Sequence, residues 1–383
     1  MILIFFRRVA PLLALVFLVA LPAFAQRRPA PYYPGRGEAW ERKKPEQVGM
    51  DSALLDEAIR FAKGQVEPKS VAQVIAARQR QESHPEIIGP TKERGANNGL
   101  VLRHGYIVAE YGETDRVDMT FSVTKSFLGT IAGLSVDRGL IDDLSAPVGR
   151  LVKDGGFDSP HNARITWHQM LQQTNQWDGW LWEKPSAIDE RKGHQLQEPG
   201  TFWNYNDVCV NRLSLALLRL WKQPLPQVLK ERIMDPIGAS SNWEWHGYRN
   251  SEVVIDGKTI NSVSGGGHWG GGLFISTRDM ARFGYLFLRR GKWRDRQLVS
   301  EKWVGLMTTP CPIKNDYGYL WWLQQWPGDA QTTFAARGAG GNVIWIDPNH
   351  DLVVVLRWTT NHDEIFKRIR AAVLPAVKKA GIN

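Results

Sequence analysis

Ser122-Val123-Thr124-Lys125 opens a segment, Ser122 to Arg138, whose apolar spacing predicts a helix that Gly139 ends. Side chains three positions apart share a helix face, so we expect the hydroxyl and the amine to meet. A serine hydroxyl becomes a nucleophile when a neighbouring base removes its proton, and a helix N-terminus supplies N–H groups for an oxyanion. The tetrapeptide therefore predicts that Ser122 is a nucleophile and that Lys125 is its proton partner.

The alternative interpretation of this tetrapeptide is a capped helix with an exposed lysine, because roughly one such tetrapeptide occurs by chance in a chain of this length. Context favours the catalytic interpretation. The helix directly follows a predicted sheet segment, and Phe127, Ile131 and Leu134 give it a buried stripe. The chain contains no G-x-S-x-G sequence, which excludes the nucleophile elbow of the α/β-hydrolases.

Strand patterns lie outward from this helix, toward both ends of the chain. Residues 100–109 predict a hairpin that turns at His104-Gly105, and 342–347 with 352–358 predict another across Pro348-Asn349. A further strand is expected at 319–323, and helices are expected at 165–173, 208–221, 278–290, 364–379 and from Asp51 or Ser52 to about 62. We therefore expect an α+β fold, with one antiparallel sheet built from both chain ends, flanking helices and an all-helical insertion.

The composition fits one large folded domain. The 383 residues are 43% hydrophobic and 23% charged, which excludes a disordered or collagen-like chain. The net charge of +9 is mild and scattered, so no nucleic-acid partner is expected. We expect a linker at 26–46 and a domain at 47–383, whose sheet part comprises 47–121 and 265–383 and whose helical part comprises 122–264.

Residues 1–25 have the pattern of a secretory signal peptide. Two arginines precede an apolar run from Pro11 to Leu21, which is short for a membrane anchor, and Ala23-Phe24-Ala25 is a cleavage signal. The sequence thus predicts an exported protein, periplasmic or secreted, without a stable membrane span after cleavage. Cys209 and Cys311 are too few for a disulfide scaffold, and Cys209 lies in an apolar pattern typical of a buried thiol.

Further stretches accompany the tetrapeptide, and together they span nearly the whole chain after the leader: 165–174, Pro199–Asp207, Gly270–Asp279, Tyr317–Trp322 and Gly338–Asn342. With them, the sequence resembles the serine β-lactamase-related hydrolases, the group of class C β-lactamases, penicillin-binding proteins and esterases. It also resembles the 6-aminohexanoate-dimer hydrolases. The resemblance implies a β-lactamase/transpeptidase-like fold, in agreement with the patterns above, and an acyl-enzyme on Ser122.

The resemblance also implies a tyrosine that faces the nucleophile and moves protons, within a Tyr-x-Asn motif. The candidates are Tyr205-Asn206-Asp207 and Tyr248-Arg249-Asn250, and either tyrosine could instead be a half-buried core residue. We choose Tyr205 because it precedes an apolar helix. Asp207 then replaces the family's Asn. An ionised carboxylate accepts hydrogen bonds and favours the ammonium form of Lys125, which shifts the expected base towards Tyr205.

The family's third motif is Lys-Thr-Gly or His-x-Gly on a strand that lines the site, and Gly338–Asn342 is the matching stretch. Ala339 stands where the family has Lys or His, so the implied substrate-binding cation is missing, and Arg337 lies at a different phase of the strand. Gly341 permits a close backbone approach. The N–H of Asn342, to within one residue, is expected to join that of Ser122 as an oxyanion donor.

Two further groups are candidates for substrate contact. His268 lies in the glycine-rich stretch Gly265–Gly272, which lacks the lysine of a P-loop; it either serves the substrate or proton network or is a structural histidine. Trp177, with Trp180 and Trp182, either walls an apolar acyl pocket or packs in the core.

No metal or organic cofactor is expected, since His161 and His168 stand apart from any H-E-x-x-H or cysteine cluster. The favoured function is an exported serine hydrolase that cleaves a small-molecule ester or amide through an acyl-enzyme on Ser122. One alternative is a β-lactamase or D-alanyl-D-alanine carboxypeptidase, against which Ala339 and Asp207 count. Another is a non-catalytic binding protein on the same scaffold.

Overall fold

The computed structural model describes residues 31–36, 40–79, 83–186 and 196–373, and the folded unit begins at Tyr32. The predicted signal peptide, residues 26–30 and 37–39 of the predicted linker and the end of the predicted C-terminal helix lie outside these residues. None of the described helices is long and apolar enough to cross a membrane.

The main sheet has six antiparallel strands in the order β11-β12-β13-β14-β1-β2. Its strands come from two distant parts of the chain: β1 (Asn98–Arg103), β2 (Tyr106–Tyr111), β11 (Trp322–Gln324), β12 (Thr333–Gly338), β13 (Asn342–Asp347) and β14 (Leu352–Arg357). β14 pairs with β1, so that Leu100 lies opposite Val355 in the middle of the sheet. The expected sheet from both chain ends, with turns at His104-Gly105 and after Asp347, is confirmed.

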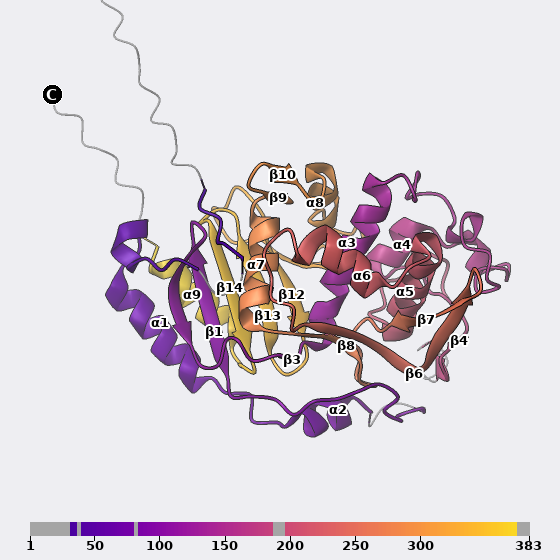
Figure 1. Cartoon of the computed structure of the whole chain (residues 1–383), viewed down its shortest axis with the longest axis horizontal. Coiled ribbons are helices and arrows are strands. Elements are labelled where there is room, and N and C mark those ends of the chain that lie inside the picture. The colour runs from indigo at the N-terminus through magenta and orange to yellow at the C-terminus, as the bar shows by residue number, and fades with distance from the viewer. Residues whose placement is uncertain (1–30, 37–39, 80–82, 187–195, 374–383) are drawn as a thin grey trace, which may run out of the picture. The chain divides into compact units, whose positions relative to one another are not determined.

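Helices cover both faces of this sheet (Figure 1). α1 (Ser52–Gly64) and α9 (His362–Ala371) bury apolar side chains, among them Leu55 and Phe366, against one face. α7 (Thr277–Leu288) and α3 (Thr124–Asp137) pack on the other face within the larger core. α1 begins as its sequence predicts, because the Asp51 carboxylate accepts a 3.0 Å hydrogen bond from Leu54 N.

The helical part contains α4 (Trp167–Gln172), α5 (Asp207–Trp221) and α6 (Leu225–Leu229), followed by a π-helical turn, η5 (Lys230–Met234). α5 begins where the Asn206 side chain accepts a 3.0 Å hydrogen bond from Cys209 N. Cys209 is buried on this helix and forms no disulfide with Cys311, which is buried as well. The remaining short elements are η1 (Pro45–Val48), α2 (Val71–Gln79), η3 (Val148–Arg150), η4 (Asn162–Arg164), β4 (Trp180–Leu181), β5 (Lys184–Pro185), β9 (Lys292–Trp293), β10 (Arg296–Gln297) and α8 (Glu301–Met307).

A β-hairpin occupies the end of the stretch that was expected to be helical. β6 (Glu244–Ile255) and β7 (Lys258–Val263) join β3 (Asp118–Met119) and β8 (Gly272–Ile275) in a second sheet of order β3-β8-β6-β7. The turn is Asp256-Gly257, with φ of 49° and 77°. An Asp-Gly pair between β-branched runs is a strong signal for a hairpin with a two-residue turn. The helical assignment of this stretch was wrong because it overlooked this local signal.

The contact between α3 and α8 gives a test of the packing. A Cβ on Gly133 would lie 2.3 Å from the indole of Trp303, whereas one on exposed Gly305 of α8 would meet nothing within 4 Å. We expect Gly133→Ala to lower the free energy of unfolding by about 1–3 kcal/mol through overpacking. Gly305→Ala, a matched helical control, should raise it by about 0.5–1 kcal/mol. Urea unfolding measures both, and a Gly133→Ala protein as stable as the wild type would contradict the observed packing.

Candidate active site

Ser122, the predicted nucleophile, stands on a tight turn between the second sheet and α3. A 3₁₀ turn, η2 (Phe121–Val123), precedes α3, and Phe121 has a left-handed φ of 49°. Thr124 Oγ1 donates to Phe121 O at 2.7 Å and accepts from Leu273 N at 2.9 Å, which ties the turn to β8. A strained non-glycine backbone held in this way is typical of functional sites, and it fixes the direction of the partly exposed Ser122 side chain.

Lys125 is the centre of a buried hydrogen-bond network. Its side chain is 1% exposed, and Nζ lies 2.8 Å from Ser122 Oγ, 2.6 Å from Asp207 Oδ1 and 3.3 Å from Gly265 O. Three acceptors match the three N–H groups of an ammonium. Burial pushes the pKa of Asp207 up, but the charges and hydrogen bonds of Lys125 and His268 outweigh burial and hold that pKa well below its ordinary value. The resting network is therefore an ion pair with Ser122 hydrogen-bonded to its cation.

Tyr205 lies beside this network, one residue before the cap of α5. Lys125 Nζ is 5.1 Å from the centroid of its ring. Burial, and then the charge of Asp207, raise the pKa of Tyr205 far above 10, against the opposing effects of a hydrogen bond with Ser122 and the charge of Arg78. Tyr205 therefore keeps its proton in the resting site. This differs from the expectation that it is the base, because the negative charge of Asp207 acts on the phenol as well as on the lysine.

The other tyrosine candidate is part of the core. Tyr248 lies on β6, is 2% exposed, and its hydroxyl accepts a 3.3 Å hydrogen bond from Asn211 Nδ2. Of the two predicted candidates, the structure places Tyr205 and not Tyr248 next to Ser122.

His268 lies on the other side of Asp207 from Lys125. Its Nδ1 is 3.3 Å from Asp207 Oδ2, and its ring packs against Trp269 at 4.5 Å between centroids. The preceding residue, Gly267, approaches so closely that a Cβ there would lie 2.8 Å from Asp207 Oδ2. The glycine-rich stretch thus brings a histidine and a backbone carbonyl, Gly265 O, to the Lys125–Asp207 pair, so His268 belongs to the charged network.

The end of β12 reaches the turn that carries Ser122, and the residue involved is Gly338. A Cβ on Gly338 would lie 2.0 Å from Thr120 O and 3.2 Å from Ser122 N. The chain then turns back, so Asn342 begins β13 opposite Gly338 and binds Ala339 O and Arg357 with its side chain. The backbone next to Ser122 N is therefore that of Gly338 and not that of Asn342, so the residue expected as the second oxyanion donor was misplaced by more than one position.

The same geometry changes the alignment of the third motif. With Gly338 as the strand glycine, the residue in the Lys or His position is Ala336, which is 1% exposed, and not Ala339. Arg337 points to a different partner, since its Nη2 lies 3.2 Å from Asp363 Oδ1. Gly341 packs against Thr359, where a Cβ would lie 1.9 Å from the carbonyl oxygen. The residue that would carry the family's cation is therefore Ala336 and not Ala339, which corrects the predicted alignment.

Of the two interpretations of Trp177, a pocket wall or a core residue, the structure supports the second. Trp177 is 3% exposed and its Nε1 donates a 2.7 Å hydrogen bond to Gly156 O, so it is a core residue. Trp182 packs against Tyr248. The rings that surround Tyr205 are instead Trp203, Tyr317 and Trp322. These rings lie in Pro199–Asp207 and Tyr317–Trp322, two of the stretches on which the resemblance rests. The local signal that could have indicated them was the two-residue spacing of Trp203 and Tyr205.

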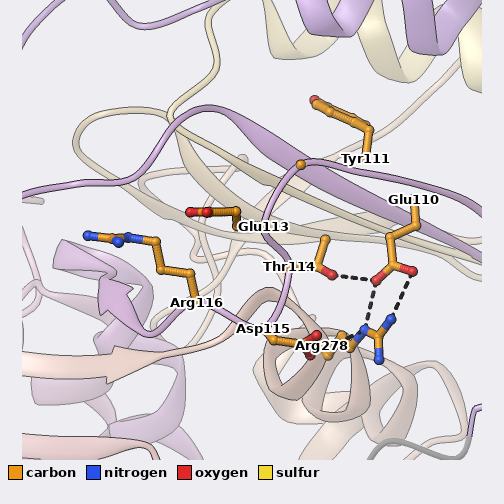
Figure 2. Close-up of a pocket in the computed structure, with 8 residues that line it drawn as sticks. Glu110, Tyr111, Glu113, Thr114, Asp115, Arg116 and Arg278 are labelled. Atoms are coloured by element: carbon orange, nitrogen blue, oxygen red, sulfur yellow. Dashed lines mark hydrogen bonds and ion pairs between the residues drawn. The ribbon is translucent and has the colours of Figure 1, made fainter.

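A separate pocket of about 640 Å³ lies where β2 ends, and Figure 2 shows its residues. Glu110 accepts bonds of 2.8 and 3.1 Å from Arg278, and Thr114 donates to the same carboxylate. Its carboxylate is thus fully engaged in a structural ion pair, and the residues of the network around Ser122 do not line this pocket. No group of three or more His, Cys, Asp or Glu in the described ranges is arranged to hold a metal ion.

Comparison with known proteins identifies the family. The model of the family described as Beta-lactamase matches residues 96–378. The chain belongs to the β-lactamase family. A 6-aminohexanoate-dimer hydrolase of Paenarthrobacter ureafaciens is 23% identical over 310 residues, which are 71% of this chain and 74% of that protein.

Solved structures show the same fold. EstCE1, a hydrolase with promiscuous acyltransferase activity, has a TM-score of 0.55 and 17% identity over 84% of this chain and 99% of its own. The D-amino acid amidase of Ochrobactrum anthropi SV3 has a TM-score of 0.54 and 16% identity, over 79% of this chain and 98% of its own. The resemblance and the fold class inferred from the sequence are thereby confirmed.

The ion pair predicts a pH-dependent cost for Asp207→Asn. The substitution leaves the buried Lys125 without a counter-charge, and we expect it to lower the free energy of unfolding at pH 7 by about 3 kcal/mol. Because the folded pKa of Asp207 lies below its unfolded value near 3.8, its stabilisation is complete above that pH and declines as the pH falls. The cost should therefore shrink by about 1 kcal/mol per pH unit below 4.

Urea unfolding at pH 7, 4 and 3 measures this difference, with Asp295→Asn at an exposed position as the control that shows neither effect. An equal cost of Asp207→Asn at all three pH values would show that Asp207 is not held ionised by the network.

Proposed function

We propose that this protein is a serine hydrolase that cleaves an ester or amide through an acyl-enzyme on Ser122. The observation that carries the proposal is the chain of contacts from Ser122 Oγ to Lys125 Nζ at 2.8 Å and from Nζ to Asp207 Oδ1 at 2.6 Å. A structural role for Lys125 would explain its ion pair with Asp207 but not the position of Ser122 on a strained turn beside it. A buried ammonium next to a partly exposed hydroxyl is the arrangement that proton transfer requires.

In the proposed reaction, Asp207 stays ionised and holds Lys125 in place, and Lys125 relays the proton. While Oγ attacks the carbonyl carbon, Lys125 takes the proton of Ser122 and passes one of its own protons on to Tyr205, so that the ammonium is restored. The N–H of Ser122 and the backbone at Gly338-Ala339 stabilise the oxyanion. Tyr205 donates its proton to the leaving oxygen or nitrogen and recovers it through Lys125. Water then hydrolyses the acyl-enzyme through the same groups.

The substrate class follows from the site and from the relatives. The matched relatives and structures are named as a 6-aminohexanoate-dimer hydrolase, an amidase and a hydrolase with acyltransferase activity, which supports an amide or ester as substrate. Ala336 offers no cation to a carboxylate, and Asp207 cannot donate to an acylamide carbonyl as an asparagine would. Both features favour simple esters and uncharged amides over β-lactams.

The proposed location is outside the cytoplasm. It is supported by the pattern of residues 1–25 in the sequence, which combines a basic start, an apolar run and a small-residue cleavage signal. The reaction itself needs neither ATP nor a reduced nicotinamide, which suits an exported enzyme.

Ser122→Ala should abolish covalent labelling by a fluorophosphonate probe and lower ester hydrolysis by at least about 10³-fold, because the nucleophile is removed. In-gel fluorescence and a spectrophotometric ester assay measure the two effects. Exposed Ser145→Ala is the matched control and should behave as the wild type. Undiminished labelling of the Ser122→Ala protein would refute the assignment of the nucleophile.

Tyr205→Phe should lower turnover of alkyl esters by at least about 10²-fold, since it deletes the proton donor for the leaving group. The loss should be smaller for p-nitrophenyl esters, whose leaving group departs without a proton. Tyr248→Phe, the control in the core, should change turnover little. Steady-state kinetics with both ester types checks this, and the opposite ranking of the two variants would identify Tyr248 as the functional tyrosine.

A further inference from the structure

Four aromatic rings form a continuous cluster around the proton donor. We call Trp203, Tyr205, Tyr317 and Trp322 the aromatic cluster. Tyr205 lies 5.6 Å from Trp322, 6.1 Å from Trp203 and 6.2 Å from Tyr317 between ring centroids. The other three rings lie 5.1–6.1 Å from one another. Every ring of the cluster therefore contacts the other three.

The cluster keeps exposed aromatic surface next to the nucleophile. Trp203, Tyr205 and Trp322 are partly exposed, whereas Tyr317 is 1% exposed and its hydroxyl accepts a 2.8 Å hydrogen bond from Gln173. The neighbour of Trp322 along the chain, Trp321, is 0% exposed and packs in the core. The chain at the start of β11 thus directs Trp321 into the core and Trp322 toward Tyr205, where its remaining surface is available to a ligand.

The charges beside the cluster limit what it can bind. Lys314 Nζ lies 5.2 Å from the centroid of Trp203 and 2.6 Å from Asp316 Oδ1. A cation already over the ring disfavours a second cation there, and its pairing with Asp316 leaves it a weak partner for an anion. The charge pattern therefore favours an uncharged ligand.

We propose that the aromatic cluster binds the leaving group of the substrate, and that this group is an uncharged aryl or arylalkyl alcohol or amine. The inference rests on the proposed function, in which Tyr205 protonates the leaving atom. Because a proton donor must lie within hydrogen-bond distance of the atom that it protonates, the rings packed around Tyr205 lie against the leaving group and not the acyl group. Aromatic pairs add about 0.5–1.5 kcal/mol each, which is about 2- to 12-fold in binding.

The test compares acetate esters that differ in the alcohol alone: ethyl, benzyl and 2-naphthylmethyl acetate. These alcohols have similar acidity, so intrinsic reactivity is nearly constant and differences in kcat/KM report contacts of the leaving group. For the wild-type protein, we expect kcat/KM for the benzyl ester to exceed that for the ethyl ester by about 10-fold, and the naphthylmethyl ester to be at least as good.

The decisive variant is Trp322→Leu, with Trp203→Leu as a second variant should the first fail to fold. Each should reduce the benzyl-to-ethyl ratio by about 5- to 10-fold. The matched control is Trp326→Leu, since Trp326 is partly buried near the same strand but packs against the α1/α9 side of the sheet. Its ratio should equal that of the wild type, and thermal unfolding verifies that each variant is folded.

Two results would overturn the inference: a wild-type ratio near 1, or an equal fall for both esters in the folded Trp322→Leu and Trp203→Leu variants. The second result would mean that the rings merely position Tyr205. Failure of the proposed function has a different signature, because a wild-type protein that neither reacts with the fluorophosphonate probe nor hydrolyses any of the esters would refute the enzyme itself.

Discussion

The buried ammonium of Lys125 is the constraint on which the site depends. An unpaired ammonium in a protein interior costs several kcal/mol, so the fold must bring acceptors to it. Ser122 comes from one turn earlier in the same segment, Asp207 from the start of α5, and Gly265 O from the glycine-rich stretch. Three separate parts of the chain therefore converge on one nitrogen, and this convergence leaves the hydroxyl of Ser122 beside a proton carrier.

Two strands hold the turn that carries Ser122 in place. β8 fastens the turn before α3 through Thr124, and the end of β12 packs on the same turn where only a glycine fits, at Gly338. The main sheet that supplies β12 is assembled from both ends of the chain, so the turn that carries Ser122 is supported by residues more than two hundred positions away. The candidate active site thus lies where the sheet part meets the helical part.

Local signals in the sequence predicted most of the elements, and distant contacts explain what they missed. The N-cap at Asp51 and the turn at His104-Gly105 act within a few residues, so pattern and turn chemistry suffice to place them. The residue whose backbone lies next to Ser122 depends on how the turn after Gly338 folds back. The sequence motif alone led us to predict Asn342 at that position. The aromatic cluster joins rings more than a hundred residues apart, which no periodicity reveals.

The central claim, that Ser122 is acylated with Lys125 as its proton relay, is tested most directly by rapid-quench mass spectrometry during ester turnover, with peptide mapping of the trapped species. The account predicts a protein whose mass is increased by the acyl group, with the modification on Ser122, and no such species in a folded Lys125→Met protein. Turnover without any acylated protein at the earliest quench times, or acylation of a different residue, would contradict it.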